Sequence, residues 1–591
     1  MSSNTPECCS THKKYAMEPS LTGKLWELQE PDEHFVNAIM RHANVAEILA
    51  RLIALRVSSV DEVQAFLTPT LRDSLPDPLV LQGMENAILR VVQAITEEES
   101  LLIWGDYDVD GITATALLLQ FFAKLGRRIP FYVPSRVHGY GATQKALAEV
   151  WIRTNIPKVI LMVDCGITAH ETLAQLKDCG VDVIVLDHHS PGHILPPAHT
   201  LVDPHLPGNP KELQKICAAG LVFLFLVGLN RVLRIAIATY KEPDLRFFLD
   251  LVALGTVCDV MPLVGLNRAY VAQGLKILTK QQNLGLRALS NIANIKTSFL
   301  AYHLAFVFGP RLNAPGRLHN ADPSIHLLTA QTEEDAEFWA LELDRLNQKR
   351  RILEDEVLKE ALPLAESQRD RPFLLICGNN WSTGVLGIIA GRLKEHFGKP
   401  CCVISFDETG LGRGSGRSVP GLDLGAFIHQ AKDAGLLEEG GGHALAAGFS
   451  LQRTCLADFE ALLIKATQKI IGEPTSVMVD SILSLSGATP DFVQLINRLA
   501  PFGRGNSAPL FLFSNVCIEY AKIIGRNHIS CIVSQNDGMR LPAVAFRSVG
   551  TALGEILLAH DGLYNIVGAL EMNTWKGKVT VQIYIEDARR G

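Results

Sequence analysis

The sequence predicts an α/β protein built on a parallel sheet, followed by a smaller α/β unit and a C-terminal β-barrel. Between residues 84 and 186, apolar runs rich in Val, Ile and Leu alternate with amphipathic stretches, the pattern of strands covered by helices on both faces. From about Ser476 the pattern changes to short apolar runs bounded by turn residues, which is typical of a small barrel. Three carboxylates at alternate positions, Asp106, Asp108 and Asp110, directly follow the first strand.

The first α/β unit is expected to contain alternating helices and strands. Helices are predicted at 84–96, 112–125, 144–154 and 169–179, and strands at 100–104, 129–133, 158–163 and 181–186. The most apolar stretch, Ile216 to Leu229, is about 14 residues long, shorter than the roughly 20 that a bilayer span needs. We therefore expect a buried helix there.

Bulk composition describes an ordinary globular protein. The 591 residues predict several domains, and 48% hydrophobic with 20% charged residues is the usual balance. A formal net charge of −7 neither predicts nor excludes a nucleic-acid partner, so any basic footprint must be local. The 12 Cys lack a Cys-x-x-Cys spacing, and Met1 to Ser20 has no apolar signal core. These features predict a reduced, cytoplasmic protein that does not enter the membrane.

The three alternate Asp residues after residue 104 have two interpretations. Crowded at the end of a buried strand they would repel one another unless a cation compensated them, and hard oxygen ligands favour Mg²⁺ or Mn²⁺. The alternative is an Asp-rich turn whose side chains cap local amides. From this stretch alone the two interpretations are equally good.

Two further strand ends favour the metal site. Strand 158–163 is followed by Asp164, and strand 181–186 by Asp187-His188-His189. Because the carboxyl ends of parallel strands meet at one edge of a sheet, these side chains are expected to lie together. The apolar run 247–257 adds Asp259, whose alternative interpretation is a helix-end carboxylate. Carboxylates with one or two imidazoles suit a hydrolase of phosphate esters that uses two divalent cations to activate water.

At this point the chain resembles a known family. Asp106-x-Asp108-x-Asp110-Gly111, Asp164 and Asp187-His188-His189 are similar to the motifs of the DHH phosphoesterase superfamily, and further stretches of the chain resemble its RecJ family. These matching stretches are Ser135 to Gly141, Gly309 to Arg317, Gly414 to Ser418, Gly440 to Ala444 and Pro501 to Asn506. They occur in the expected order from about residue 70 to the end.

The resemblance implies a site. Two Mn²⁺ or Mg²⁺ ions would be held by Asp106, Asp108, Asp110, Asp164, His188 and Asp259. Asp164, His188 and His189 would also be catalytic. Asp164 would bridge the ions, and His189 would face the scissile phosphate, either as a ligand of the second metal or as a donor to the phosphate oxygens. Expected DNA contacts are Arg136, Tyr140, Arg311, Asn313, Arg317, Arg413, Ser415, Arg417 and His443. Where the family usually has Trp-His-x-Gly, this chain has Trp381-Ser382-Thr383-Gly384, so that His contact is not carried over.

We expect five segments along the chain. They are an N-terminal lead-in at 1–70, a DHH domain at 71–330, a connecting helix at 331–365, a DHHA1 α/β domain at 366–472 and an OB-fold barrel at 473–591. Thr332-x-x-Asp335 resembles a capping box that opens the connecting helix, and Pro363 is expected to end it near Leu362.

The function implied by the resemblance is a 5′-to-3′ exonuclease that degrades single-stranded DNA in recombination and repair. A single-strand-binding protein and a helicase are the implied partners. One alternative is a DHH phosphodiesterase of oligonucleotides or cyclic dinucleotides, although those relatives are much shorter. The other is a non-catalytic DNA-binding accessory protein, but such proteins lose metal ligands and this chain retains every expected one.

Overall fold

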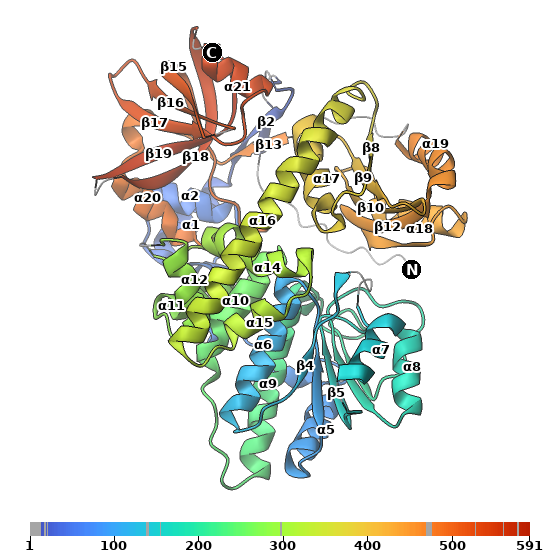
Figure 1. Cartoon of the computed structure of the whole chain (residues 1–591). Helices are drawn as coiled ribbons and strands as arrows, with labels where there is room; N and C mark the ends of the chain where they lie inside the picture. The colour runs from blue at the N-terminus through green and yellow to red at the C-terminus, as the bar shows by residue number, and fades with distance from the viewer. Residues whose placement is uncertain are drawn as a thin grey trace, which may run out of the picture. The chain divides into compact units, whose positions relative to one another are not determined.

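The computed structural model describes residues 13–16, 19–20, 22–136, 141–153, 155–295, 298–467, 476–525, 527–559, 561–575 and 578–591. The chain divides into two compact units. The α/β unit comprises Leu75–Met261 and Tyr270–Ile471, and the barrel unit comprises Met1–Ser74, Pro262–Ala269 and Gly472–Gly591. Figure 1 colours both units along the chain.

The α/β unit begins with a five-stranded sheet whose strands are all parallel. Its order is β4 (Phe131–Tyr132), β3 (Leu101–Trp104), β5 (Val159–Val163), β6 (Asp182–Leu186) and β7 (Thr200–Val202). Helices α7 (Gln144–Arg153) and α8 (His170–Asp178) pack on one face, and α5 (Met84–Thr96), α6 (Val109–Lys124) and α9 (Ala218–Ala236) lie on the other (Figure 1). The predicted alternation is confirmed, and β7 is an additional strand that was not predicted from the sequence.

Helix α9 is longer than expected from the sequence. It has 19 residues, so by length and composition alone it is long enough to cross a membrane. In its most apolar window, however, 72% of the residues are buried inside the fold, where α9 packs against α5 and α6. Its apolar character is therefore accounted for by burial within the α/β unit, as predicted.

A helical layer follows the sheet. It contains α10 (Leu249–Cys258), α11 (Gly265–Thr279), α12 (Leu284–Ile292), α13 (Ala301–His303), the π-helix η5 (Leu304–Phe308), α14 (Gly309–Leu318), α15 (Asp322–Leu328) and α16 (Glu333–Glu366). The hydroxyl of Thr332 accepts a hydrogen bond from the amide of Asp335, which confirms the predicted start of α16. The predicted stop at Pro363 is wrong, because a proline in the last turn removes only one hydrogen bond and the helix continues to Glu366.

A second, mixed sheet completes the α/β unit. Its order is β11 (Glu439–His443), β12 (Ala446–Gln452), β10 (Leu411–Arg417), β9 (Cys401–Phe406) and β8 (Leu374–Asn379). Strands β8 and β9 are parallel and the other neighbours are antiparallel. Helix α17 (Thr383–Phe397) packs with α16 on one face, and α18 (Leu424–Asp433) and α19 (Leu456–Thr467) cover the other.

The barrel unit confirms the predicted C-terminal barrel. Its sheet contains β14 (Ser481–Ile482), β15 (Phe511–Ile524), β16 (His528–Ser534), β17 (Arg540–Ala545), β19 (Lys578–Arg590) and β18 (Leu563–Trp575). It closes because β15 also pairs with β18. Helices α20 (Pro490–Ile496) and α21 (Ala552–Ala559) pack against it.

The N-terminal segment is more than the expected lead-in. Helices α1 (Glu33–Ala43), α2 (Glu47–Ala54) and α3 (Glu62–Leu67) share one hydrophobic core with the barrel. Strand β2 (Leu25–Glu30) pairs with β1 (Lys13–Ala16) and with β13 (Ser476–Val479). The sequence predicted β13 as a barrel strand, but it belongs to this separate three-stranded sheet. The buried Trp26 donates from Nε1 to Asp587 at 2.8 Å, which connects the first strands to the end of the chain.

Candidate metal centre

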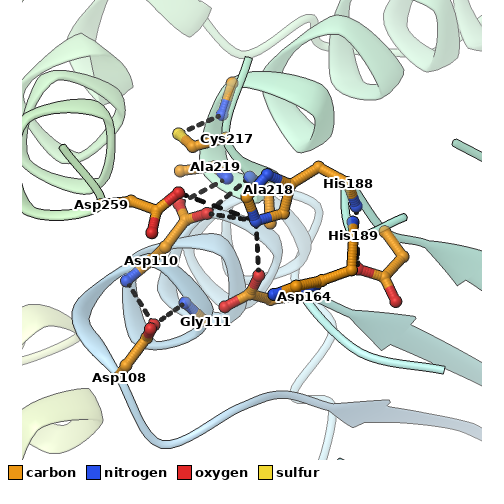
Figure 2. A network of polar contacts seen from close by, with 12 residues as sticks. Asp108, Asp110, Gly111, Asp164, His188, His189, Cys217, Ala218, Ala219 and Asp259 are labelled. Atoms are coloured by element: carbon orange, nitrogen blue, oxygen red, sulfur yellow. Dashed lines mark hydrogen bonds and ion pairs between the residues drawn. The ribbon is translucent and has the colours of Figure 1, made fainter. Parts of the chain in front are cut away.

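The carboxyl ends of β3, β5 and β6 bring the predicted acidic residues together. Asp106, Asp164 and Asp187 each follow one of these buried strands and are themselves buried. His188 follows Asp187, and Figure 2 shows its ring between Asp110, Asp164 and Asp259. The sheet edge chosen from the sequence is therefore the edge at which these side chains meet.

Asp108 and Asp110 occupy the first turn of α6. The Oδ1 atom of Asp108 accepts from the amides of Asp110 at 2.9 Å and Gly111 at 3.1 Å, which caps the helix. Asp110 is held from the other side, since its carboxylate accepts from the amides of Ala218 at 2.6 Å and Ala219 at 2.9 Å at the start of α9 (Figure 2). The sequence left a capping turn and a metal-binding cluster as alternatives. In the structure Asp108 caps the helix and is also part of the acidic cluster.

The imidazole of His188 joins three carboxylates. Its Nε2 atom lies 3.2 Å from Asp164 Oδ1, 3.6 Å from Asp110 Oδ2 and 3.7 Å from Asp259 Oδ2 (Figure 2). Among the described residues, three groups have ligand atoms within 4.8 Å of one another: Asp106 with Asp108 and Asp164; Asp110 with His188 and Asp259; and Asp164 with His188 and His189. Asp164 and His188 each belong to two of these groups, so the three groups form one continuous cluster.

Unusual backbone conformations occur at or next to two of these acidic residues. Asp164 has a φ of 63°, a left-handed conformation that Asp tolerates better than most residues. Asp259 caps the end of α10, and the next residue, Val260, has a φ of 55°, which is unusual for a β-branched side chain. Such strain is characteristic of functional sites, where the surrounding structure must hold it.

The electrostatics of the cluster favour a bound cation. Burial, together with the charge of Asp108, raises the pKa of Asp106 to about 8. Burial and neighbouring carboxylates also raise the pKa of Asp110 and of Asp164. The Oδ1 atom of Asp106 is buried and has no hydrogen-bond partner among the described residues. Crowded carboxylates that repel one another are the kind of ligand set that a hard divalent cation stabilises, so these residues fit Mn²⁺ or Mg²⁺.

Asp187 holds His189 rather than facing the cluster. Its Oδ1 accepts from His189 Nδ1 at 2.7 Å and from the amide of His188 at 2.8 Å, while its Oδ2 accepts from the amide of Ile167 at 3.0 Å. Burial disfavours the charged form of both side chains, but the hydrogen bond and the charge attraction between them outweigh it. The pKa of Asp187 is lowered to about 2 and the pKa of His189 is raised to about 9. His189 is therefore an imidazolium at neutral pH.

Three arginines predicted as DNA contacts interact beside the carboxylates. Arg136 lies over the ring of Tyr107 at 4.0 Å, next to Asp106, and Arg317 donates to the carbonyl of Gly384 at 3.0 Å. Burial, Arg136 and Arg417 lower the pKa of Arg317 to about 9, and burial and Arg136 lower the pKa of Arg417. These half-buried cations repel one another, so an anion between them would be stabilised.

The other predicted DNA contacts have varied surroundings. Ser415 lies beside Arg417 on β10, Arg413 is exposed on the same strand, and the ring of His443 stacks on that of His189 at 6.4 Å. Asn313 is half-buried on α14.

Arg311 is engaged in an ion pair with Asp344 at 2.9 Å, and Tyr140 lies outside the described residues. Ser382 stands at the N-cap of α17, where the family usually has His.

The support that these side chains receive was not predicted from the sequence. The amides of Ala218 and Ala219 that hold Asp110 were not identified, although the change to a helix after Cys217 was a usable signal. Gly316 was also missed, where a Cβ atom would lie 2.7 Å from the carbonyl of Tyr107. That close approach lets α14 carry Arg317 to the turn that bears Asp106.

Comparison with known proteins agrees with this geometry. Residues 100–256 match the DHH family, N-terminal domain; residues 370–472 match the DHHA1 domain; and residues 479–587 match the RecJ OB domain.

Three curated or solved relatives resemble the chain over most of its length. It is 31% identical to the single-stranded-DNA-specific exonuclease RecJ of Bacillus subtilis, over 95% of this chain and 70% of the relative. It is 33% identical to RecJ of Escherichia coli, over 92% and 96%. A structure of RecJ from Thermus thermophilus with Mn²⁺ has a TM-score of 0.81 and 29% identity over 96% of this chain and 79% of that one. The same protein with Mg²⁺ has a TM-score of 0.75 and 26% identity over 96% and 78%. The chain belongs to the RecJ family of single-stranded-DNA-specific exonucleases.

Proposed function

We propose that this protein is a metal-dependent exonuclease that degrades single-stranded DNA from its 5′ end to 5′-mononucleotides, in recombination and repair. The observation that carries the proposal is the presence of an acidic and a basic cluster in one compact unit. Carboxylates that fit divalent cations lie beside half-buried arginines whose mutual repulsion an anion would relieve. A phosphodiester with divalent cations supplies both, and the RecJ relatives act on such a substrate.

The metal ligands follow from the three groups of close ligand atoms. Asp106, Asp108 and Asp164 would hold one Mn²⁺ or Mg²⁺ ion, and Asp110, His188 and Asp259 would hold a second. Such ions, when bound, lower the pKa of a coordinated water and neutralise charge on the phosphate oxygens. Burial lowers the pKa of His188, which keeps its imidazole neutral and able to act as a ligand.

The remaining side chains position the strand and stabilise developing charge. The imidazolium of His189 donates from Nε2 towards the scissile phosphate, while Asp187 fixes the ring. Arg136, Arg317 and Arg417 bind the phosphate on the other side, where guanidinium groups can form two parallel hydrogen bonds. Ser415 and His443 would receive the 5′ end.

The less central contacts remain part of the proposal. Arg413 is exposed and is assigned to the phosphate path, together with Asn313. Arg311 would have to leave Asp344 to bind DNA, and Tyr140 is assigned a stacking contact from the family motif alone. We also propose a cytoplasmic location, and a single-strand-binding protein and a helicase as partners.

Matched buried aspartates test the site. Asp164→Asn should abolish nucleotide release from a single strand in Mn²⁺ while thermal unfolding shows a folded protein. The control is Asp250→Asn. Asp250 is also buried, and burial raises its pKa to about 7, but it accepts a hydrogen bond from the amide of Leu251 and belongs to none of the three groups. Equal activity of Asp164→Asn and wild type, or equal loss in both variants, would contradict the assignment.

A further inference from the structure

Two neighbouring strand ends of the first sheet carry the same short motif. Strands β6 and β7 are parallel, and Leu186 lies opposite Val202, so Asp187 and Asp203 are each the first residue beyond the strand. The amide of Asp187 donates to the carbonyl of Val202 at 3.1 Å, which continues the pairing past β6. Adjacent strands lie about 4.8 Å apart, so the two motifs stand side by side.

Each motif forms an Asp–His pair of the same construction. Asp203 Oδ1 accepts from the amide of His205 at 2.7 Å and from its Nδ1 at 3.3 Å, as Asp187 Oδ1 does from the amide and Nδ1 of His189 at 3.2 and 2.7 Å. Both aspartates are buried, with side-chain exposures of 0% and 1%, and both histidine side chains are 28% exposed. Each ring is therefore anchored at Nδ1 and leaves the outer part of its ring accessible.

His205 lies in the same region as His189, near His443. The ring of His443 stacks on His189 at 6.4 Å with an angle of 12°. Burial and the nearby imidazoles of His189 and His205 lower the pKa of His443. His205 thus lies close enough to His443 to interact with it. The proposed mechanism assigns a role to His443 but none to His205.

We propose that His205 is a further DNA-binding residue, whose Nε2–H donates to a backbone phosphate next to the one held by His189. Asp203 holds the ring of His205 at Nδ1, as Asp187 holds the ring of His189, so that Nε2 of each ring is on the outer side. Neighbouring sheet strands would then present two imidazole N–H donors side by side to successive phosphates of one DNA strand. This inference rests on the proposed exonuclease function and assigns it a residue outside the metal cluster.

The chain offers a matched control at the opposite end of the same strands. His199 precedes β7, and its Nδ1 lies 3.5 Å from Asp182 at the start of β6. Its side chain is 35% exposed, so it resembles His205 in partner and accessibility but lies away from the site. The test compares His205→Ala, His205→Lys and His199→Ala in the full-length protein.

The first measurement is steady-state release of 5′-labelled nucleotide from single-stranded oligothymidylate in Mn²⁺. For His205→Ala we expect KM to rise about tenfold with kcat within about twofold of wild type, as for loss of one charge-assisted contact. His205→Lys, which places an N–H donor at the same position, should recover most of the loss, and His199→Ala should match wild type.

The second measurement identifies the phosphate. One linkage at a time, beyond the scissile one, is replaced by an uncharged methylphosphonate. At the linkage that His205 contacts, the replacement should impair wild type but add nothing to the His205→Ala defect. Additive defects at every linkage, a fall in kcat instead of a rise in KM, or an equal effect of His199→Ala would each overturn the proposal.

The outcome can be separated from that of the proposed function. If wild type releases no nucleotide, the exonuclease proposal fails, and His205 is judged by equilibrium binding of the same strand in EDTA. Weaker binding by His205→Ala than by His199→Ala would still support the contact. Equal binding by the two variants would contradict the proposed contact between His205 and the phosphate.

Discussion

Replacing Asp106 by Asn should stabilise the metal-free protein while destroying its metal site. Asp106 is buried at the end of β3, its Oδ1 has no hydrogen-bond partner among the described residues, and its pKa is raised to about 8. Asn keeps the size of the side chain and removes the charge. The metal-free wild type therefore carries an electrostatic cost that the variant lacks.

The magnitude follows from the difference between the folded and unfolded pKa values. Between pH 3.8 and about 8 the folded protein holds a proton on Asp106 that the unfolded chain has released, so stability falls as pH rises through this window. At pH 7, about three units above 3.8, the cost is at most about 4 kcal/mol. Because Asp106 shares this repulsion with Asp108, we expect about half, roughly 2 kcal/mol, or a rise in Tm of a few degrees.

Thermal unfolding in EDTA and in Mn²⁺ measures the effect. In EDTA at pH 7 the Asp106→Asn variant should melt above wild type, and the gap should shrink at pH 5, where less of the cost remains. In Mn²⁺ the order should reverse, because metal binding stabilises only the protein with its full ligand set. A variant less stable than wild type in EDTA, or stabilised equally by Mn²⁺, would refute this reasoning.

Three other predictions follow from the same geometry. Asp187→Ala should lower kcat about 10- to 100-fold at saturating Mn²⁺, because the imidazolium that it orients is released; unchanged kcat would exclude that role. Mn²⁺ binding should release protons at pH 7, seen by calorimetry in buffers of different ionisation enthalpy, and its affinity should fall from pH 8 to pH 6, because Asp106 has a pKa of about 8. Gly384→Ala should destabilise by about 1–3 kcal/mol, because its Cβ would lie 2.0 Å from the carbonyl of Arg317. Gly391→Ala on the same helix, with nothing within 4 Å, should be neutral or stabilising in the same unfolding assay.

The acidic cluster could be predicted because its signal is local. Each buried strand is a run of apolar residues, and each ends directly in the residue that the site uses, such as Asp164 after β5. The rule that parallel strands share their carboxyl edge then brings together side chains far apart in the sequence. Asp259 was also identified, although it caps a helix rather than following a strand.

Features that depend on tertiary packing could not be predicted from the sequence. Strand β7 has three residues, too few to show a pattern, and with it the Asp203–His205 pair was missed. Pro363 did not end α16, because the helix packs along its length. The first helices gave an amphipathic pattern, but nothing in it shows that their apolar face completes the barrel core.

The most direct test of the exonuclease assignment compares single strands labelled at the 5′ end or at the 3′ end, with duplex DNA and RNA as competing substrates, in Mn²⁺, Mg²⁺ or EDTA. We expect immediate release of the label from the 5′-labelled DNA single strand alone, as a mononucleotide, and no release in EDTA. Release that begins at the 3′ end, equal attack on duplex, or activity that persists in EDTA would contradict the assignment.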